Sequence, residues 1–311
     1  MRFQAALGYV VVTIALTGCA SNNGDPIGNG NGVAGAGGLA GGGVGGSTIA
    51  NGGAGVAGGA GAAAEACPET RTPLRSTGTV VELGFAPTLA GKPFVVGEPN
   101  TVVGGQISPL NLRFYVSELS LTAADGSQLP VDLVSAAGQL EPYGVHLVNF
   151  EEPASTSIHV LAPAGDYTGA RFTFGINDAC NSGDANRDAP LSANSQMVWP
   201  HVAGSLFLRY EAQWQADATA AATAAPPPSM IHMGGVVGSV FAPQATLTGA
   251  LAVPATGSVT RTIQVSFDEI FRGASSSDDV SNVPIPTPEV IAGERLRRAV
   301  PTLTIFTLAA P

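Results

Sequence analysis

Two short segments hold the side chains that could bind a soft metal ion. The first runs from Met197 to His201 and has Trp199 at its centre, so an extended backbone would place these three alternate residues on one side. The second is 230–235 (MIHMGG), where His232 lies between two methionines. Imidazole and thioether groups suit copper better than magnesium or calcium, which prefer oxygen ligands. The residue types favour copper, although a histidine in a β protein can equally be a hydrogen-bonded structural residue.

A loop rich in Asp and Asn offers a second kind of metal chemistry. Asp184, Asn186 and Asp188 have the alternating oxygen spacing of a calcium-binding loop. However, Ala189 stands where such a loop needs glycine, and Ser195 stands where it needs glutamate. A calcium site is therefore one interpretation, and a solvated loop that binds no ion is the other.

Composition and motifs exclude several classes of function. The formal charge is -10, and the 13 Lys and Arg residues form no run longer than Arg297 and Arg298, whereas nucleic-acid binding needs clustered cations. The sequence also has no G-x-S-x-G, H-E-x-x-H, C-x-x-C-H or G-x-x-x-x-G-K motif. We therefore expect a binding protein that is neither an enzyme nor a nucleic-acid binder.

The N-terminus resembles a bacterial lipoprotein signal. Arg2 is followed by a largely apolar stretch, 3–16, and then by Leu-Thr-Gly-Cys ending at Cys19. This predicts a signal peptide at 1–18 and an acylated Cys19 that anchors the chain to a lipid bilayer. Ala20 occupies the position where an inner-membrane retention signal would have Asp, which favours the outer membrane of a bacterial envelope. An ordinary secretory signal with a chance cysteine is the alternative.

The segment after the predicted anchor is unusually rich in small residues. Of the 44 residues in 21–64, 18 are Gly and 10 are Ala. Glycine adds no apolar surface and loses the most backbone entropy on ordering, so this composition cannot form a core. We expect 19–66 to be a disordered Gly/Ala-rich tether with a reach of about 35 to 40 Å, and 67–311 to be the folded domain.

The other two cysteines fall within the predicted domain. In an oxidising envelope compartment, Cys67 and Cys180 would be expected to form a disulfide. Such a bridge would close a long loop and contribute up to about 4 to 5 kcal/mol in the chain-entropy model. The competing interpretation makes one of them a metal-binding thiolate, but the sequence has no C-x-x-C spacing.

Strand patterns dominate the predicted domain. Segments rich in Val, Thr, Leu, Phe and Tyr are separated by Gly, Pro, Asn or Asp, and they are 79–85, 110–122, 145–150, 157–160, 167–176, 205–214, 245–253, 261–271 and 302–308. In the second of these the alternation changes phase at Leu119, as a β-bulge would cause. The best helical pattern is 288–300. The sequence predicts an all-β domain, an antiparallel β-sandwich of immunoglobulin-like or related type.

Four landmarks in this order resemble the MbnP-like family. They are 111–121 (NLRFYVSELSL), 164–177 (AGDYTGARFTFGIN), 197–212 (from Met-Val-Trp to Phe-Leu-Arg-Tyr-Glu-Ala) and 231–234 (IHMG). Members of this family are periplasmic or surface copper-binding proteins encoded beside a di-haem partner, MbnH. This chain departs from the usual pattern because it has Val198 and places His201 where the family has a second Trp.

The resemblance implies a role for individual residues. It implies copper binding through histidines, with His232 as a ligand, and oxidation of Trp199 to kynurenine by the di-haem partner. We rank His146 and His201 as the next ligands, with Met197 as a soft ligand for Cu(I). The implied function is copper acquisition or homeostasis at the cell envelope. A surface interaction or carbohydrate-binding sandwich that holds no metal is the alternative.

Overall fold

The computed structural model describes residues 67–102, 105–181, 187–199, 204–216, 230–236, 241–274 and 288–310. The predicted signal peptide, the tether and Cys19 lie outside these residues, as do His201, Asp184 and Asn186. No helix in the described ranges is long and apolar enough to cross a membrane.

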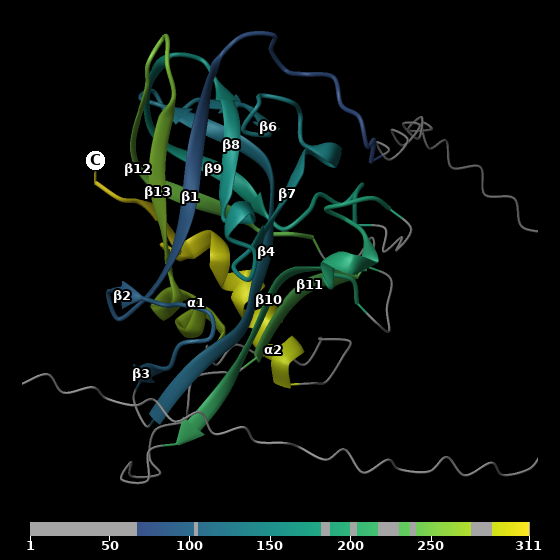
Figure 1. The fold of residues 1–311 in the computed structure, drawn as a ribbon, viewed down its shortest axis with the longest axis vertical. Coiled ribbons are helices and arrows are strands. Elements are labelled where there is room, and N and C mark those ends of the chain that lie inside the picture. Colours follow the sequence, from purple (N-terminus) through teal and green to yellow (C-terminus); the bar gives the residue numbers. More distant parts are fainter. Residues whose placement is uncertain are drawn as a thin grey trace, which may run out of the picture. The chain divides into compact units, whose positions relative to one another are not determined.

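The described residues form a 14-stranded sheet (Figure 1). In the first half of the chain the strands are β1 (Thr79–Leu89), β2 (Lys92–Pro93), β3 (Asn100–Val102), β4 (Gly105–Ala123), β5 (Gln128–Pro130), β6 (Asp132–Val134) and β7 (Val145–Asn149). In the second half they are β8 (Ser157–Ala162), β9 (Gly165–Phe174), β10 (Gly204–Ala216), β11 (Met230–Val236), β12 (Gln244–Val253), β13 (Val259–Ser266) and β14 (Phe306–Leu308). All nine predicted strand segments contain a strand, and the all-β fold class is confirmed.

The strand order is β11-β10-β4-β9-β12-β14-β13-β1-β8-β6, with β2 added to β1 and with β3, β5 and β7 added to β4. Most pairs are antiparallel as predicted, but β1 with β13 and β12 with β14 are parallel, so the sheet is mixed. The second case has a geometric reason. Since β12 and β13 run in opposite directions, a strand inserted between them must be parallel to one of them, and β14 is antiparallel to β13.

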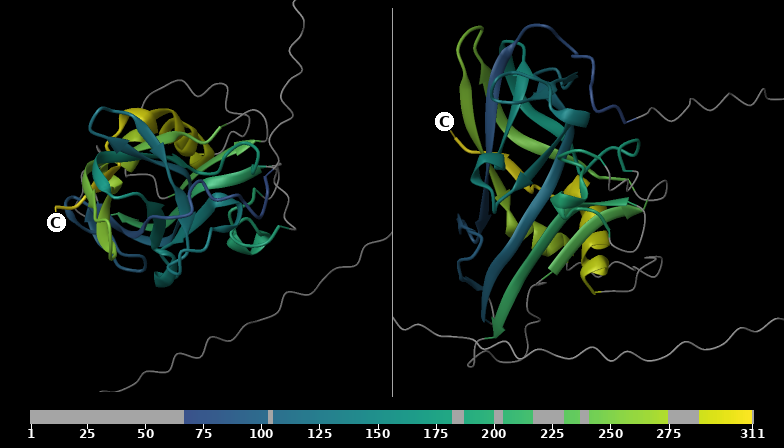
Figure 2. Two further views of the ribbon diagram at one scale, coloured as in Figure 1. Left: turned by 90° about the horizontal axis from the view of Figure 1, so that it is seen from above. Right: turned by 45° about the vertical axis from the view of Figure 1, so that its right-hand side comes forward.

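The sheet folds over on itself around an aromatic core. Phe85 of β1 and Phe114 of β4 are far apart in the strand order, yet their ring centroids are 5.2 Å apart in an edge-to-face contact. Phe306 of β14 lies 6.3 Å from Phe85 and 6.2 Å from Phe114. Its centroid is also 4.9 Å from that of Phe172 and 5.2 Å from that of Phe174, both on β9. Figure 2 shows the strands enclosing this interior, so the two faces of the sandwich belong to one continuous sheet.

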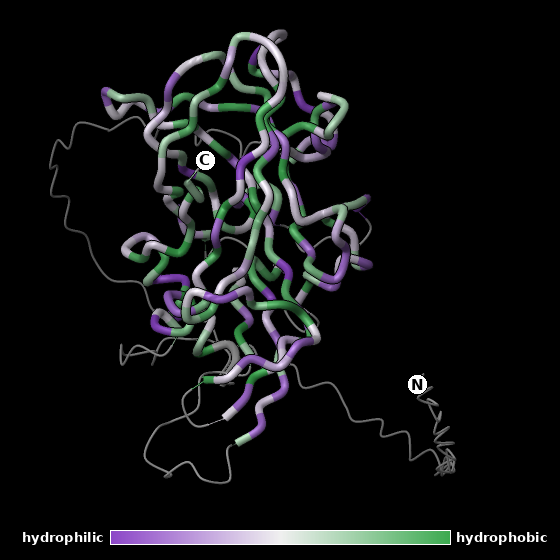
Figure 3. Tube along the Cα trace, turned by 60° about the vertical axis from the view of Figure 1, so that its left-hand side comes forward, coloured by the Kyte–Doolittle hydropathy of each residue, from purple (hydrophilic) through white to green (hydrophobic). Residues whose placement is uncertain are grey.

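The hydropathy pattern follows from this arrangement. Hydrophobic and hydrophilic residues alternate along many strands (Figure 3), because successive side chains point to opposite faces of a sheet. The predicted bulge in β4 is present: the register with β9 moves from Ser117↔Thr173 to Ser120↔Arg171, which leaves one extra residue on β4. Glu118 adopts a positive φ of 50° at this point.

Two α-helices accompany the sheet in the described part of the domain. The helix α2 (Pro288–Ala299) lies within the predicted segment 288–300. The helix α1 (Phe267–Ala274) was predicted as part of a strand, and that prediction is wrong from Phe267 onward. Ser266 Oγ accepts a hydrogen bond from the Glu269 N–H at 3.3 Å, which caps the helix start as in a Ser-x-x-Glu capping sequence. Phe267, Ile270 and Phe271 have helical spacing and are buried, so the sequence did contain the signal.

The predicted disulfide between Cys67 and Cys180 is present, with their Cα atoms 4.8 Å apart and a sequence separation of 113. Neither sulfur is therefore a free thiolate ligand. Arg187 supports the bridge because its Nη1 donates a hydrogen bond to the Cys180 carbonyl at 2.7 Å. The bridge joins the start of the described domain to the loop that follows β9.

Phe306→Ala tests the aromatic core. The Phe306 side chain is 0% exposed and contacts four other aromatic rings, so its truncation should lower the free energy of unfolding by about 3 to 5 kcal/mol. Denaturant unfolding followed by circular dichroism measures this loss. Phe306→Leu keeps most of the volume and should cost clearly less. Equal losses for the two variants would show that β14 does not hold the layers together through this ring.

Candidate metal centre

The strand β11 separates two kinds of side chain onto its two faces. Ile231 and Met233 are both 0% exposed and lie in the hydrophobic core. Met230, His232 and Gly234 occupy the opposite face, because side chains alternate along a strand. Met230 is 39% exposed. The alternation along β11 thus places one histidine and one thioether on the same face, pointing away from the core.

The neighbouring strand β10 repeats this separation. Leu208 and Tyr210 are 0% exposed on the core side, and Arg209 and Glu211 lie on the other. The register pairs Arg209 with His232 and Glu211 with Met230. A cationic and an anionic side chain therefore lie directly across from the two candidate metal ligands.

The His232 ring is held between a carboxylate and an indole. Its Nε2 lies 2.9 Å from Glu211 Oε1, and its side chain is 15% exposed. The ring centroid is 6.2 Å from that of Trp199, with an interplanar angle of 73°. Within the described part of the chain, Nδ1 of this ring has no hydrogen-bond partner. His232 therefore offers one free nitrogen beside Trp199.

Glu211 is itself fixed by Arg209. The guanidinium donates from Nε to Oε1 at 3.0 Å and from Nη2 to Oε2 at 3.1 Å. Its Nη1 also donates to the backbone carbonyl of Gln196 at 3.1 Å. Burial acts to raise the pKa of the Glu211 carboxyl, but the bonds from Arg209 and His232 outweigh it and hold this pKa below its ordinary value. Glu211 is thus a carboxylate at neutral pH.

Trp199 is positioned by backbone bonds to β10. Val198 forms an antiparallel bridge with Ser205, and the Trp199 N–H donates to the Gly204 carbonyl at 3.3 Å. The indole lies over Gly234, where an added β-carbon would be 2.6 Å from the indole nitrogen and 2.8 Å from the Ser205 carbonyl oxygen. Only glycine leaves room for the ring at this place, which explains one of the two glycines after His232.

The ends of β10 and β11 are joined by Asn181. Its side chain is 1% exposed, accepts a hydrogen bond from the Ser205 N–H at 2.8 Å and donates one to the Gly235 carbonyl at 3.3 Å. Asn181 directly follows Cys180, so the disulfide loop and the ends of both strands are linked by one buried amide.

Helix α2 supports the strand at the level of the histidine. Figure 1 shows α2 near β11, and Gly293 of this helix faces the backbone at His232 and Met233. An added β-carbon at Gly293 would clash with the His232 carbonyl oxygen. Glycine thus allows the helix axis to approach the strand closely.

Two other predicted ligands, Met197 and His146, do not join His232, and the third, His201, lies outside the described residues. Met197 is 0% exposed within the hydrophobic core, so Met230 is the accessible thioether. His146 on β7 lies 3.3 Å from Glu141 Oε1 through Nδ1 and 3.1 Å from the Ser155 carbonyl through Nε2. Because β10 and β4 lie between β11 and β7, three strand spacings of roughly 14 Å in total separate the two histidines.

The described residues contain no cluster of the usual metal-binding side chains. Among the residues that the structure describes, no group of three or more His, Cys, Asp or Glu side chains could hold a metal ion. Of the predicted calcium loop only Asp188 is described, and its carbonyl accepts the Leu191 N–H in a turn at 3.1 Å. Among the described residues, the soft donor on the same face as His232 is the Met230 thioether.

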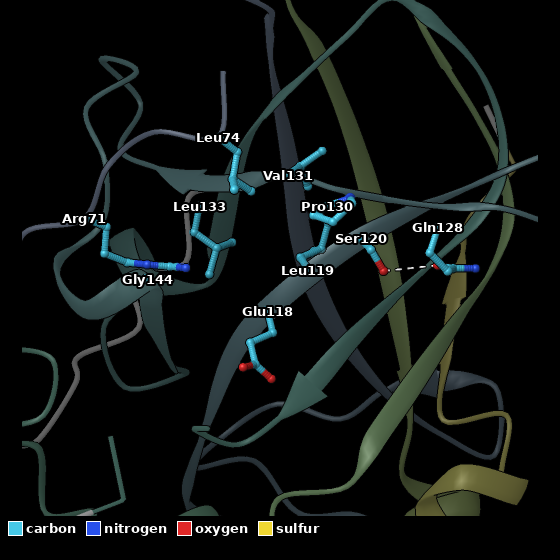
Figure 4. A pocket seen from close by; sticks show the side chains of 10 residues that line it. All are labelled: Arg71, Leu74, Glu118, Leu119, Ser120, Gln128, Pro130, Val131, Leu133 and Gly144. Atoms are coloured by element: carbon cyan, nitrogen blue, oxygen red, sulfur yellow. Dashed lines mark hydrogen bonds between the residues drawn. The ribbon is translucent and has the colours of Figure 1, made fainter. Parts of the chain in front are cut away.

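A cavity of about 340 Å³ lies elsewhere in the domain (Figure 4). Its lining includes Arg71, Glu118, Leu119, Gln128 and Leu133, and none of the predicted metal ligands. The Glu118 carboxylate accepts a hydrogen bond from the Thr173 hydroxyl at 2.7 Å. This cavity is separate from the histidine and tryptophan pair.

A protein-family model, MbnP, matches residues 78–287 and spans β10, β11, Trp199 and His232. The chain belongs to the MbnP family. Among solved structures, MbnP from Methylosinus trichosporium aligns over 75% of this chain and 98% of its own, with 18% identity and a TM-score of 0.47. No curated protein is significantly similar to the chain.

Arg209 and Glu211 belong to the candidate site but were not among the site residues predicted from the sequence. Arg209 and Glu211 are two positions apart on a strand, so they share a face and can form a fixed ion pair. The alternation Leu-Arg-Tyr-Glu shows which face is polar. What it could not show is that this face lies against His232, since that depends on the pairing of β10 with β11.

Gly234→Ala tests the packing of the indole. The new β-carbon should displace Trp199, shifting its fluorescence emission toward longer wavelength as it becomes more exposed, and should lower the thermal midpoint of unfolding. The chain has two tryptophans, so the experiment uses a Trp214→Phe background in which Trp199 alone emits. An unchanged emission spectrum in that background would contradict the contact between Gly234 and Trp199.

Proposed function

We propose that this MbnP-family chain is an envelope-anchored protein that binds copper as Cu(I), with His232 as the central ligand, and acts in copper acquisition or homeostasis. Membership of the family associates the chain with a methanobactin- or copper-related system. The observation that carries the proposal is the His232 ring, which packs beside Trp199 on a face that also bears Met230 and whose Nδ1 has no partner among the described residues.

The chemistry of the donors fits Cu(I). This ion accepts imidazole and thioether ligands, whereas calcium takes 6 to 8 oxygens. Met230 and His232 lie on the same face of β11, about 7 Å apart along the strand, and Met230 is the exposed thioether. The only carboxylate that contacts His232 among the described residues, Glu211, is already bound by Arg209. Hard-cation binding is therefore disfavoured here.

Trp199 fits a second part of the proposal. We propose that a di-haem partner of the MbnH type oxidises this residue to kynurenine. Dioxygen or peroxide would supply the added oxygen, and after hydrolysis the indole C2 carbon would leave as formate. Support comes from the position of the indole, which is only partly buried and packs at the edge of the domain core next to the His232 ring. Kynurenine would place a carbonyl and an aromatic amine beside the ligand.

The N-terminal features set the place of action. Acylation of Cys19 would hold the chain on the outer membrane, and residues 19–66 would separate the domain from the lipid surface. A sandwich that binds a partner or carbohydrate without metal remains the alternative, and it predicts that the substitutions below leave copper binding unaffected.

His232→Ala tests the ligand. Competition of the purified chain with a Cu(I) chelator of known affinity should show loss of most Cu(I) affinity in this variant, while circular dichroism shows an unchanged fold. Met230→Leu should weaken binding less, because it removes one thioether. His159→Ala is the matched control. His159 lies on β8, opposite Glu82 on β1 and Val134 on β6 and away from β11, so its substitution should leave the Cu(I) affinity unchanged. Equal affinity in wild type and His232→Ala would overturn the assignment.

The state of Trp199 is tested on protein from the native host. Copper content and the mass of the peptide that contains Trp199 are measured in the same preparation, with and without the di-haem partner. We expect bound copper together with a mass change at Trp199 that requires the partner. The peptide containing Trp214 is the internal control and should keep its unmodified mass. An unmodified Trp199 and no copper uptake with the partner present would favour the alternative without metal.

A further inference from the structure

We infer that Glu211, clamped by Arg209, is a positioning residue that holds His232 in the Nε2–H tautomer and so makes Nδ1 the nitrogen that binds the metal. This inference rests on the proposed function for its consequence. Its first part, the choice of tautomer, is a property of the metal-free protein and can be measured without copper.

The first step concerns which group carries the proton. Glu211 receives two hydrogen bonds from the Arg209 guanidinium, one on each oxygen. A carboxylate in this state has only acceptor oxygens. The proton in the 2.9 Å contact between Glu211 Oε1 and His232 Nε2 must therefore belong to the histidine ring.

The second step concerns the other nitrogen. In a neutral imidazole one nitrogen is a donor and the other an acceptor. With the proton on Nε2, the lone pair is on Nδ1, which has no partner among the described residues. Nδ1 is also the ring nitrogen nearer to the β11 backbone. A metal bound there would lie close to the strand, on the face that carries Met230.

The third step concerns how firmly this choice is imposed. The exposed fractions of the three side chains are only 22% for Arg209, 23% for Glu211 and 15% for His232, so water competes weakly for these bonds. Arg209 is fixed in turn by the Gln196 carbonyl. Carboxylate partners of this kind orient a ligating imidazole and increase its basicity.

His146 shows the contrasting case within the same chain. Its Nδ1 faces the Glu141 carboxylate at 3.3 Å and its Nε2 faces the Ser155 carbonyl at 3.1 Å. Both ring nitrogens therefore already contact acceptor oxygens, so neither is left open to a metal. His146 and His232 thus differ in the partner of the second nitrogen, and only the His232 ring leaves that nitrogen without a partner among the described residues.

The experiment compares Glu211→Ala, Glu211→Gln and the control Glu151→Gln. Glu151, in the turn after β7, accepts a hydrogen bond at 3.0 Å from Nε of Arg113, which lies on β4 next to β10, and no histidine contact to Glu151 is found among the described residues. Long-range ¹⁵N NMR of the metal-free protein reports the His232 tautomer, and competition with a chelator reports Cu(I) affinity. Wild type should show Nε2–H. Glu211→Ala should lose this preference and bind Cu(I) about 10- to 100-fold more weakly.

The conservative variants sharpen the test. Glu211→Gln keeps an acceptor oxygen, so it should retain the Nε2–H tautomer and most of the affinity, and Glu151→Gln should match wild type in both measurements. A wild-type His232 protonated at Nδ1, or a Glu211→Ala variant with unchanged tautomer and affinity, would overturn the inference. A wild type with the Nε2–H tautomer but no Cu(I) affinity would overturn the proposed function and leave the positioning by Glu211 standing.

Discussion

The register between β10 and β11 is the constraint on which the rest of the site depends. It places Arg209 opposite His232 and Glu211 opposite Met230. A slip of one residue in either strand would turn every side chain to the other face. His232 would then enter the core and Met233 would face outward, so neither the carboxylate contact nor the indole contact could form. The hydrophobic residues on the inner face therefore fix the geometry of the polar ones on the outer face.

Two glycines allow β11 to be held from both directions. At Gly234 the Trp199 indole lies directly against the strand, and at Gly293 the helix α2 does the same near the His232 carbonyl. The aromatic residues of α1, Phe267 and Phe271, pack against Tyr210 of β10 with centroids 5.4 and 5.6 Å apart. Strand β11 lies at one end of the strand order, where main-chain groups would otherwise be open to pairing with another chain. Contacts with Trp199 and α2 thus hold the edge strand β11, which carries the proposed ligand His232.

The sequence supported the fold better than the site. Alternation located the strands and the bulge near Leu119 because these depend on neighbouring residues. The helix α1 was not predicted because Phe267, Ile270 and Phe271 are each β-prone and extend the preceding strand pattern, although Ser266 and Glu269 form a capping sequence. The grouping of His232 with Trp199 agrees with the family resemblance. Its separation from His146 and the burial of Met197 could not be derived locally, since both depend on which strands pair across long intervals.

The disulfide has a mechanical consequence for a domain attached through its N-terminal side. A force applied through the residues before Cys67 would pass along the covalent bridge to Cys180, and so would reach the domain without first peeling β1 from the sheet. The next residue, Asn181, is hydrogen-bonded to both β10 and β11. The load would then be shared by two paired strands at the end next to Trp199. With the proposed N-terminal anchor, the cross-link would let the domain be pulled while the order of its β-sheet is maintained.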